Sequence, residues 1–295
     1  AYSLVHQKEK VVTRLEDIAE LKAGQVADWL YDRMGDAHFV QSSRHYPALY
    51  RAWQAGHDAG AGRTLQSRLL DFCRFQGCDG VSLLSPEGRR VWGSENAPRA
   101  LALDLQDAVR TASATHAVVR LGPYVGTRGH LRLDFVVPLT ALPGPAPIVV
   151  LHVDPASRVF ARLQAWPMPS ASGETVLFRR EGGQILMLND LRFHPDAAAR
   201  LRIPQATGHL VFGQHLPERP GAARLVEGLD YRGVAVLGVT RAVPGTDWLL
   251  TAKLDQSEVY TESIGEVAWI GFSALLALLI SGAGLVALRQ QQQLA

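Results

Sequence analysis

The stretch VVPLTALPGPAPIVVLHVD, residues 136–154, is repeated in outline by LGVTRAVPGTDWLLTAKLD, residues 237–255. Each copy reads as an apolar strand, an Ala-x-Pro-Gly turn and a second strand that ends in an apolar-x-Asp element. A single offset aligns residues 133–154 with residues 234–255 and places Ala141, Pro143, Gly144 and Asp154 on Ala242, Pro244, Gly245 and Asp255. Two copies so far apart predict tandem domains of one fold, because a solenoid repeats over a shorter period.

The composition is that of a folded protein. The chain has 295 residues, of which 47% are hydrophobic and 20% are charged, so a disordered or collagenous class is excluded. At roughly 100 to 150 residues per domain, this length predicts two domains. The formal net charge is only +2 and the basic residues are spread along the chain, so no nucleic-acid partner is expected.

Helices and strands alternate in a way that predicts an α+β fold with two antiparallel sheets. A stalk helix is expected in residues 1–40, because apolar residues recur at helical spacing from Val11 to Leu30. In the first module, 41–154, we expect helices at 47–53, 63–75 and 98–111, a hairpin at 81–92, and strands at 116–121, 130–139 and 148–153. The second module, 155–255, opens with another hairpin at 174–189.

A transmembrane helix is predicted near the C-terminal end. No charge occurs from Val267 to Leu288, which is long enough to cross a hydrocarbon core of about 30 Å. Arg289 follows, so residues 289–295 are expected in the cytoplasm, with residues 256–266 as a connector and residues 1–266 outside the inner membrane. Because residues 1–10 hold no apolar run, we expect a first transmembrane helix to precede them.

The two cysteines leave two interpretations open. Cys73 and Cys78 either form a disulfide in an oxidising compartment or remain two thiols, since one lies in an expected helix and the other beyond Gly77. Neither has a CxxC partner or a nearby histidine, so no metal is expected, and no cofactor-binding motif is present.

The chain resembles the extracytoplasmic double Cache family, the tandem PAS-like sensor modules of bacterial membrane receptors, over essentially its whole length. The resemblance is carried by IAELKAGQVADWL at 18–30, SLLSPEGRRVW at 82–92, GETVLFRREGGQILMLNDLR at 173–192 and GVTRAVPGTDWLLTAKLD at 238–255. It implies a membrane-distal module that binds a small ligand, a membrane-proximal module that relays the event, and a cytoplasmic output domain of the histidine kinase, cyclase or chemoreceptor class.

The sequence departs from this family at one place. Members that bind amino acids or amines resemble one another in a Tyr-x-Asp strand entry, whose Asp takes the ammonium group of the ligand. Here Tyr124 is present but the Asp position is Gly126, and the nearest aromatic and Arg set, Tyr50, Arg51 and Trp53, has the wrong spacing. This departure counts against an amino-acid ligand.

Strand alternation predicts the ligand site. In the strand at 130–139, His130, Arg132 and Asp134 share one face, and Arg120 of the preceding strand is placed in the same phase. If helices cover that face it is a pocket for a carboxylate or other anion; if water covers it, it is an ordinary solvated face. The predicted ligand-binding set is Arg120, Tyr124, His130, Arg132 and Asp134, covered by Tyr50, Trp53 and Phe75. The strands of the second module are more apolar and are predicted to lack such a cluster.

The leading interpretation is the ligand-sensing region of a transmembrane signalling receptor, and the alternative is a membrane-anchored binding or adaptor protein that does not signal. No nucleophile elbow, P-loop, zinc-protease or Rossmann motif occurs, so this chain is not expected to be an enzyme. A Ser-His-Asp triad cannot be read from sequence, because its members are distant along the chain. A parallel homodimer is expected through the long N-terminal helix and part of its apolar stripe Val11, Leu15 and Ile18; the alternative is that these residues pack on their own sheet.

Overall fold

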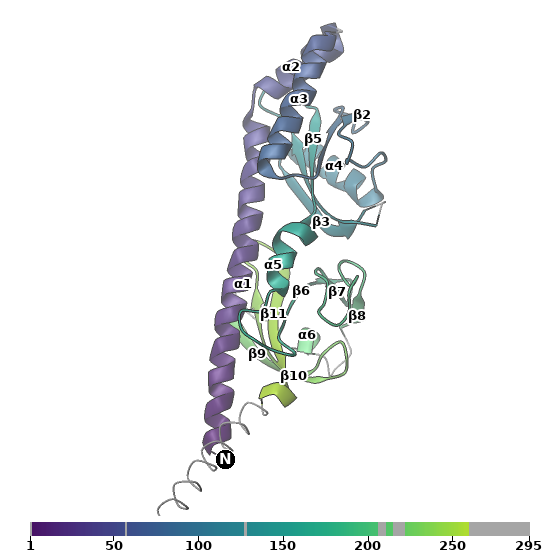
Figure 1. The fold of residues 1–295 in the computed structure, drawn as a ribbon. Coiled ribbons are helices and arrows are strands. Elements are labelled where there is room, and N and C mark those ends of the chain that lie inside the picture. The colour runs from purple at the N-terminus through teal and green to yellow at the C-terminus, as the bar shows by residue number, and fades with distance from the viewer. Residues whose placement is uncertain (1, 57, 127–128, 206–210, 215–221, 260–295) are drawn as a thin grey trace, which may run out of the picture.

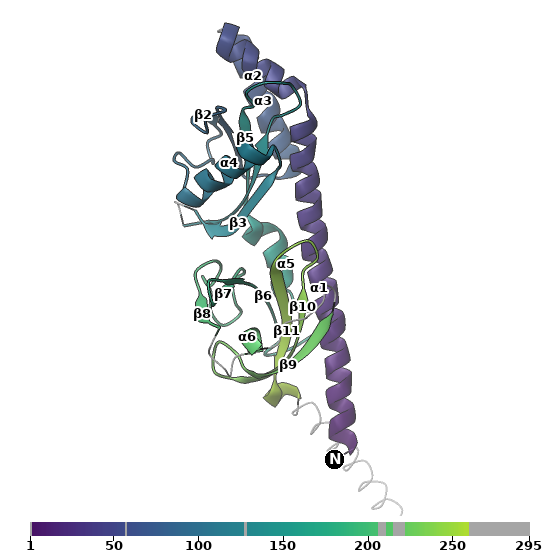
Figure 2. The same cartoon turned by 180° about the vertical axis from the view of Figure 1, so that it is seen from behind.

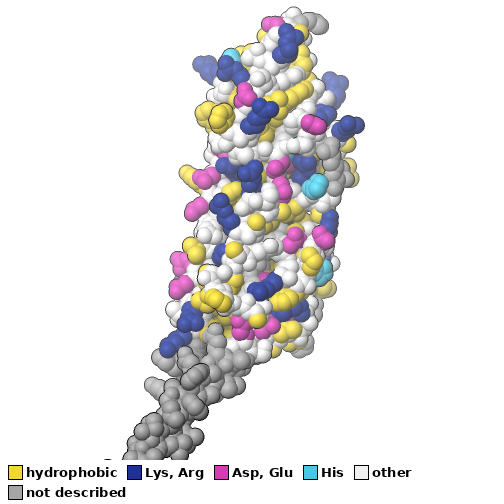
Figure 3. Space-filling model, viewed as in Figure 1, with side chains coloured by type: hydrophobic (Ala, Val, Ile, Leu, Met, Phe, Trp, Pro, Cys, Tyr) yellow, Lys and Arg dark blue, Asp and Glu magenta, His cyan; other side chains and the backbone are white. Residues whose placement is uncertain are grey.

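Two sheet modules lie one after the other along a single long helix (Figure 1). The computed structural model describes residues 2–56, 58–126, 129–205, 211–214 and 222–259. Both sheets are antiparallel and both carry helices, so the predicted α+β class with a long N-terminal helix is confirmed. On the face shown in Figure 3, acidic and basic side chains are interspersed over both modules, as is typical of a solvated protein surface.

Helix α1 (Tyr2–Ser42) runs along both modules, as the two opposite views show (Figures 1 and 2). Its apolar residues, among them Leu15, Val26 and Leu30, belong to one hydrophobic cluster that also contains Phe135 of the first sheet and Leu250 of the second. The helix therefore supplies part of the core of each module. The stripe Val11, Leu15 and Ile18 is 8%, 0% and 7% exposed, so the dimer contact predicted for it is wrong: the protomer's own second module covers it.

The first module has a five-stranded sheet in the order β2-β1-β5-β4-β3. Its strands are β1 (Gly80–Leu84), β2 (Arg90–Gly93), β3 (Val119–Val125), β4 (Leu131–Pro138) and β5 (Ile148–Val153). Helices α2 (His45–Gly56) and α3 (Ala59–Gln76) lie on the α1 side of this sheet, since Tyr50 and Leu69 share the α1 cluster. Helix α4 (Leu103–Thr115) covers the opposite face and packs on Val136 and Val150.

The segment between α4 and β3 differs from the sequence-based expectation. The helix begins at Leu103 rather than at residue 98 and continues to Thr115, where His116 ends it in the left-handed conformation with φ of 55°. Strand β3 therefore starts at Val119, and its pairing with β4 shifts register between Leu121 and Tyr124. This shift decides which face of the sheet each β3 side chain occupies.

The second module has a six-stranded sheet in the order β8-β7-β6-β11-β10-β9. A short π-helical turn η1 (Ala156–Phe160) and α5 (Ala161–Gln164) lead into it. The remaining elements are β6 (Glu174–Glu181), β7 (Gln184–Met187), β8 (Arg202–Pro204), α6 (Val211–Gln214), β9 (Ala223–Leu229), β10 (Ala235–Ala242) and β11 (Trp248–Asp255). The expected hairpins around 81–92 and 174–189 are both present, as β1–β2 and β6–β7.

The two sheets share one strand topology, but the aligned hairpins differ in length. The first hairpin closes with Pro138 opposite Ile148, and the second closes with Ala242 opposite Leu249, so the first turn is longer. Strands β5 and β11 match at the single offset seen in the sequence. By pairing, however, Leu133 corresponds to Leu237, whereas that alignment placed it on Val234.

Polar contacts hold the modules to each other and to α1. Arg179 of β6 donates to the carbonyl of Gly122 at 3.2 Å, and Arg200 donates to the carbonyl of Gly129 at 2.9 Å. Lys22 of α1 is 6% exposed and donates to the carbonyls of Arg162 in α5 and of Ala165, the residue after α5, the latter at 2.9 Å. Burial lowers the pKa of Lys22 from its usual value. The side chain thus joins α1 to the connection between the modules.

The last described residues lie beside the N-terminal part of α1. After β11, a helical turn at residues 256–259 places Glu258 and Val259 against Val11 and Leu15 of α1. Among the helices that the structure describes, none has both the length and the apolarity that a membrane crossing needs. The predicted membrane segment, Val267–Leu288, lies outside the described residues.

Both cysteines are free thiols in the structure. Cys73 is buried in α3 and Cys78 is half-buried just beyond Gly77, which ends α3 at φ of 71°. The hydrogen bond that the Cys73 thiol donates to the Cys78 sulfur, together with burial, raises the pKa of Cys73. The Cys73 thiol is therefore a poor nucleophile in this state.

The N-terminus of α3 gives a direct test of the local structure. The Asp58 carboxylate accepts from the backbone N–H groups of Gly60 at 2.8 Å and Ala61 at 3.1 Å. We expect Asp58→Ala to lower the free energy of unfolding by about 1 kcal/mol, because two N–H groups lose their acceptor. Asp58→Asn keeps the acceptor and should unfold within a few tenths of a kcal/mol of the parent. Equal urea midpoints for all three proteins would contradict the capping role.

Candidate functional site

A chain of polar side chains crosses four neighbouring strands of the first sheet. Ser82 Oγ of β1 lies 2.9 Å from His152 Nε2 of β5, and His152 Nδ1 lies 2.8 Å from Asp134 Oδ1 of β4. Tyr124 of β3 donates its hydroxyl to Asp134 Oδ2. With a neutral imidazole, Nδ1–H donates to the carboxylate and Nε2 accepts from Ser82, so each member is satisfied.

The order of three of these groups is that of a Ser-His-Asp triad, but their burial is unsuited to catalysis. Ser82, Asp134 and His152 are each 0% exposed beneath the face that α4 covers, so no substrate can reach the serine hydroxyl. Burial and the charge of Asp134 raise the pKa of Tyr124, which keeps its hydroxyl protonated as a donor. This hydrogen-bonded set of side chains is therefore a structural element that aligns the four strands.

A cavity of about 240 Å³ opens where three of these strands begin or end. Asp79 precedes β1, His130 and Arg132 lie at the start of β4, and Asp154 follows β5, while Asn96 comes from the segment after β2. At about 30 Å³ per water molecule, this volume suits a small organic molecule rather than a peptide. The cavity lies at the end of the sheet that leads into η1 and the second module.

The charges around the cavity have opposite signs. Arg132 donates to the carbonyl of Asn96 at 3.0 Å and forms no ion pair in the part of the chain that the structure describes. The Asp154 carboxylate accepts from the backbone N–H of Ala156 at 2.9 Å, and that of Asp79 accepts from the backbone N–H of Asp154. The site thus presents one guanidinium and two carboxylates to a single small space.

The structure brings together only part of the predicted site. His130 and Arg132 line the cavity, and Tyr124 and Asp134 belong to the buried chain beside it. Arg120 lies opposite Phe135, on the other face, and its guanidinium stands 5.1 Å from the Trp248 ring of the second module. Its predicted place beside Asp134 is wrong, because β3 starts later and shifts register.

The predicted aromatic cover is also on the wrong face. Tyr50 is buried in the cluster that faces α1, Trp53 packs on Gly62, and Phe75 is 90% exposed. Asn96, in the segment after β2, lines the cavity instead, while α4 covers the sheet farther along the strands. The cause is topological: α2 and α3 follow α1 directly and pack on its side of the sheet.

Gly126 explains the departure from the Tyr-x-Asp pattern. A Cβ atom at this position would lie 2.9 Å from Cδ of Arg132, so the arginine side chain occupies the space that an aspartate would need. The carboxylates of the site come instead from Asp79 and Asp154, each next to a strand end. Sequence reasoning missed both, although Asp154 stood in the repeated element.

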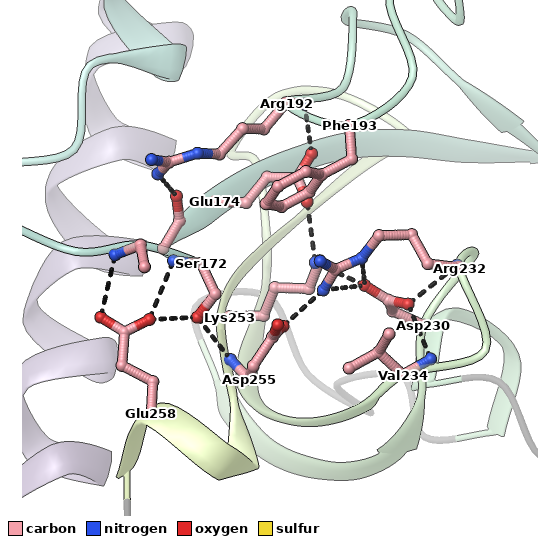
Figure 4. Close-up of polar contacts among 12 residues, drawn as sticks. Ser172, Glu174, Arg192, Phe193, Asp230, Arg232, Val234, Lys253, Asp255 and Glu258 are labelled. Carbon is pink, nitrogen blue, oxygen red and sulfur yellow. Dashed lines mark hydrogen bonds and ion pairs between the residues drawn. The ribbon is translucent and has the colours of Figure 1, made fainter. Parts of the chain in front are cut away.

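The second module contains a larger charged cluster, which the sequence did not predict (Figure 4). Lys253 of β11 is 0% exposed, and its Nζ lies 2.7 Å from Glu174 of β6 and 2.8 Å from Asp230. Arg232 pairs with Asp230 and with Asp255 at the end of β11. The expectation that this module lacks a charged cluster is wrong, because residues far apart in sequence converge on one buried lysine.

The cluster holds Asp230 in the ionised form. Burial favours the neutral form of Asp230, but the hydrogen bond and charge of Lys253, with hydrogen bonds from Arg232, outweigh it and lower the pKa. Burial and the charge of Glu174 raise the pKa of Tyr231, whose hydroxyl donates to Glu174 at 3.0 Å. Among the described residues, no group of three or more His, Cys, Asp or Glu side chains is placed to bind a metal ion.

Comparisons with known proteins gave structural relatives only. No model of a known protein family matches the chain, and no curated protein does. The ligand-binding domain of the Pseudomonas aeruginosa PAO1 amino-acid chemoreceptor PctB, solved with L-Arg, is 15% identical with a TM-score of 0.56, covering 85% of this chain and 98% of that one.

Two further relatives have the same architecture. The ligand-binding domain of the Campylobacter jejuni chemoreceptor Tlp3, solved with L-norvaline, has a TM-score of 0.61 at 10% identity, covering 86% of this chain and 94% of that one. That of the Pseudomonas fluorescens chemoreceptor CtaA, solved with L-leucine, has a TM-score of 0.53 at 14% identity, covering 85% and 97%. The fold is thus that of chemoreceptor ligand-binding domains. The double Cache fold implied by the sequence resemblance is confirmed.

The buried lysine provides the test of the second-module cluster. We expect Lys253→Met to lower the free energy of unfolding by about 3 to 5 kcal/mol, because Glu174 and Asp230 are left buried without their shared cation. The control Lys8→Met removes a surface lysine whose side chain is 41% exposed and should cost less than about 1 kcal/mol. Urea unfolding measures both, and equal losses for the two variants would contradict the role of Lys253.

Proposed function

We propose that this chain is the extracytoplasmic sensor region of a membrane receptor, with the first module distal to the membrane and binding a small zwitterion. The observation that carries the proposal is the cavity at the strand ends, which combines Arg132 with the carboxylates of Asp79 and Asp154. The relatives of this fold, solved with L-Arg, L-norvaline and L-leucine, support a ligand of this kind.

The chemistry of the cavity suggests how such a ligand is held. Arg132 binds the carboxylate of the ligand, since a guanidinium offers two parallel donors to two oxygens. His130 lies beside it and adds a donor. Asp79 and Asp154 accept from the ammonium group. With Arg120 on the other face, a simple anion would meet two carboxylates and one arginine, so a zwitterion fits this charge pattern better than the anion first expected.

The binding event would be passed from the first cavity through η1 and α5 to the helical turn at residues 256–259. Asp154 follows β5 directly, and the chain continues through η1 and α5, where Lys22 of α1 binds the carbonyls of Arg162 and Ala165. A ligand that binds one arrangement of this junction more tightly than another shifts α1 relative to the second module. The helical turn at 256–259 then carries the displacement toward the membrane and a cytoplasmic output domain.

A parallel homodimer along α1 belongs to the same proposal, on a different face from the one first expected. Leu21, Tyr31 and Phe39 are 55%, 80% and 62% exposed. With Gly24, Asp28 and Gly35 they follow successive steps of three, four, three, four and four residues, close to the spacing of a helix–helix seam. A Cβ atom at Gly24 or Gly35 would meet nothing within 4 Å, so a second helix has room to approach closely.

Calorimetry with a panel of L-amino acids tests the ligand site. We expect Arg132→Gln and Asp154→Asn each to weaken binding of the best ligand by about 10- to 100-fold, because each removes one charged hydrogen bond. Arg89→Gln, at a side chain that is 82% exposed, is the control and should bind as the parent does. Unchanged affinity in both site variants would refute the assignment.

Cysteine crosslinking in membranes tests the dimer. In a chain with Cys73→Ala and Cys78→Ala, we expect Tyr31→Cys to form a crosslinked dimer, because the two copies of this side chain face each other across the seam. Phe75→Cys, equally exposed but on α3, is the control and should not crosslink. If neither Tyr31→Cys nor Phe39→Cys gives a dimer, α1 does not form the interface.

A further inference from the structure

We propose that the second module has its own ligand site, which binds a small protonated amine and acts directly on the exit from the sensor. A cavity of about 430 Å³ lies at the start of β6, lined by Gln164, Gly173, Glu174, Thr175, Asp190 and Arg192. It is larger than the cavity of the first module, and none of the residues predicted from sequence lines it. The inference stands whether or not the first cavity binds a zwitterion.

Asp190 supplies the uncompensated charge of this cavity. One of its carboxylate oxygens accepts from the backbone N–H of Ala198 at 3.1 Å, and within the described ranges no Lys, Arg or His side chain pairs with it. The side chain is half-buried, so solvent screens its charge only in part. A ligand cation is the natural partner for such a carboxylate.

Thr175 supplies a second group without a partner. The residue is 1% exposed, and its hydroxyl oxygen forms no hydrogen bond with any described residue. A buried hydroxyl without a partner costs free energy, but this oxygen is itself inaccessible, so a bound polar molecule would recover the hydrogen bond only by displacing part of the cavity wall. Gln164 uses its amide N–H for the carbonyl of Asp190 at 3.2 Å, which leaves its own carbonyl oxygen as an acceptor.

The other charged groups of the cavity already have partners. Glu174 is neutralised by Lys253 at 2.7 Å and also accepts from Tyr231. Arg192 is exposed and donates to the carbonyls of Gly173 at 2.8 Å and Ser170 at 3.0 Å (Figure 4). The groups left for a ligand are therefore mostly acceptors next to one negative charge. They match a primary ammonium with a short polar tail.

The wall of this cavity also contacts the helical turn at residues 256–259, which follows β11 and is called the exit turn below. Arg192 donates hydrogen bonds to backbone carbonyls of residues 170–173. The N–H groups and hydroxyls of the same residues donate to the Glu258 carboxylate. Glu258 accepts from Ser170 Oγ at 2.7 Å and from the backbone N–H of Ser172 at 2.8 Å. Burial opposes its charge, but these hydrogen bonds outweigh burial and lower the pKa of Glu258. A ligand against Gly173 and Asp190 thus lies one segment away from the exit turn.

Ethanolamine and glycolate, titrated into the full chain by calorimetry, test the site. They share a hydroxyl and differ in the sign of their charge, so we expect heat of binding from ethanolamine and none from glycolate. Asp190→Asn keeps the contact with Ala198 and should weaken ethanolamine binding at least tenfold. Thr175→Val keeps the shape and should weaken it severalfold, and Asp196→Asn, an exposed aspartate nearby, should leave it unchanged.

Three outcomes would overturn the inference. The first is that ethanolamine does not bind, and the second is that both Asp190→Asn and Thr175→Val, folded by circular dichroism, bind it with parental affinity. The third is that Arg132→Gln or Asp154→Asn abolishes ethanolamine binding while Asp190→Asn does not, which would place the amine in the first cavity. Failure of the first cavity to bind amino acids would leave the second site intact.

Discussion

The packing of one face of α1 against both sheets is the constraint on which the rest of the structure depends. Leu15 and Leu30 belong to the same cluster as Phe135 and Leu250, so the two modules share one hydrophobic core through a single helix. A packed core does not deform continuously, and a shift of α1 at one module must be accommodated at the other. This geometry suits a receptor better than a passive anchor, because a local binding event has a rigid element to displace.

Each module contains its own buried polar network, centred on a residue at an equivalent strand position. His152 and Lys253 both stand two residues before the aspartate next to the end of the last strand; His152 joins Asp134 to Ser82, and Lys253 joins Glu174 to Asp230. The first module uses a chain of hydrogen bonds across four strands, and the second uses ion pairs. The two modules thus place these networks at the same strand position with different chemistry, and each network lies beside a cavity at the same end of its sheet.

What the sequence could predict was local. Turn residues and alternation located both hairpins, and helical spacing located α1, because these signals lie within a few residues of each other. Arg120 was misplaced because the extension of α4 to Thr115 and the register shift in β3 depend on tertiary packing. Lys253, Glu174 and Asp230 come from separate strands and loops, so no spacing in the chain indicates their contact. Asp154 could have been found, since it occupies the repeated strand end.

The position of α1 at the start of the chain has a consequence for the order of folding. The upper half of the helix can pack as soon as β4 and β5 are made, but Leu15 and Val11 wait for β10 and β11, more than two hundred residues later. Until then an apolar stripe is left bare on a nascent chain, a situation that favours aggregation. The N-terminal half of α1 is therefore the part of the helix that waits longest for its packing partners during synthesis.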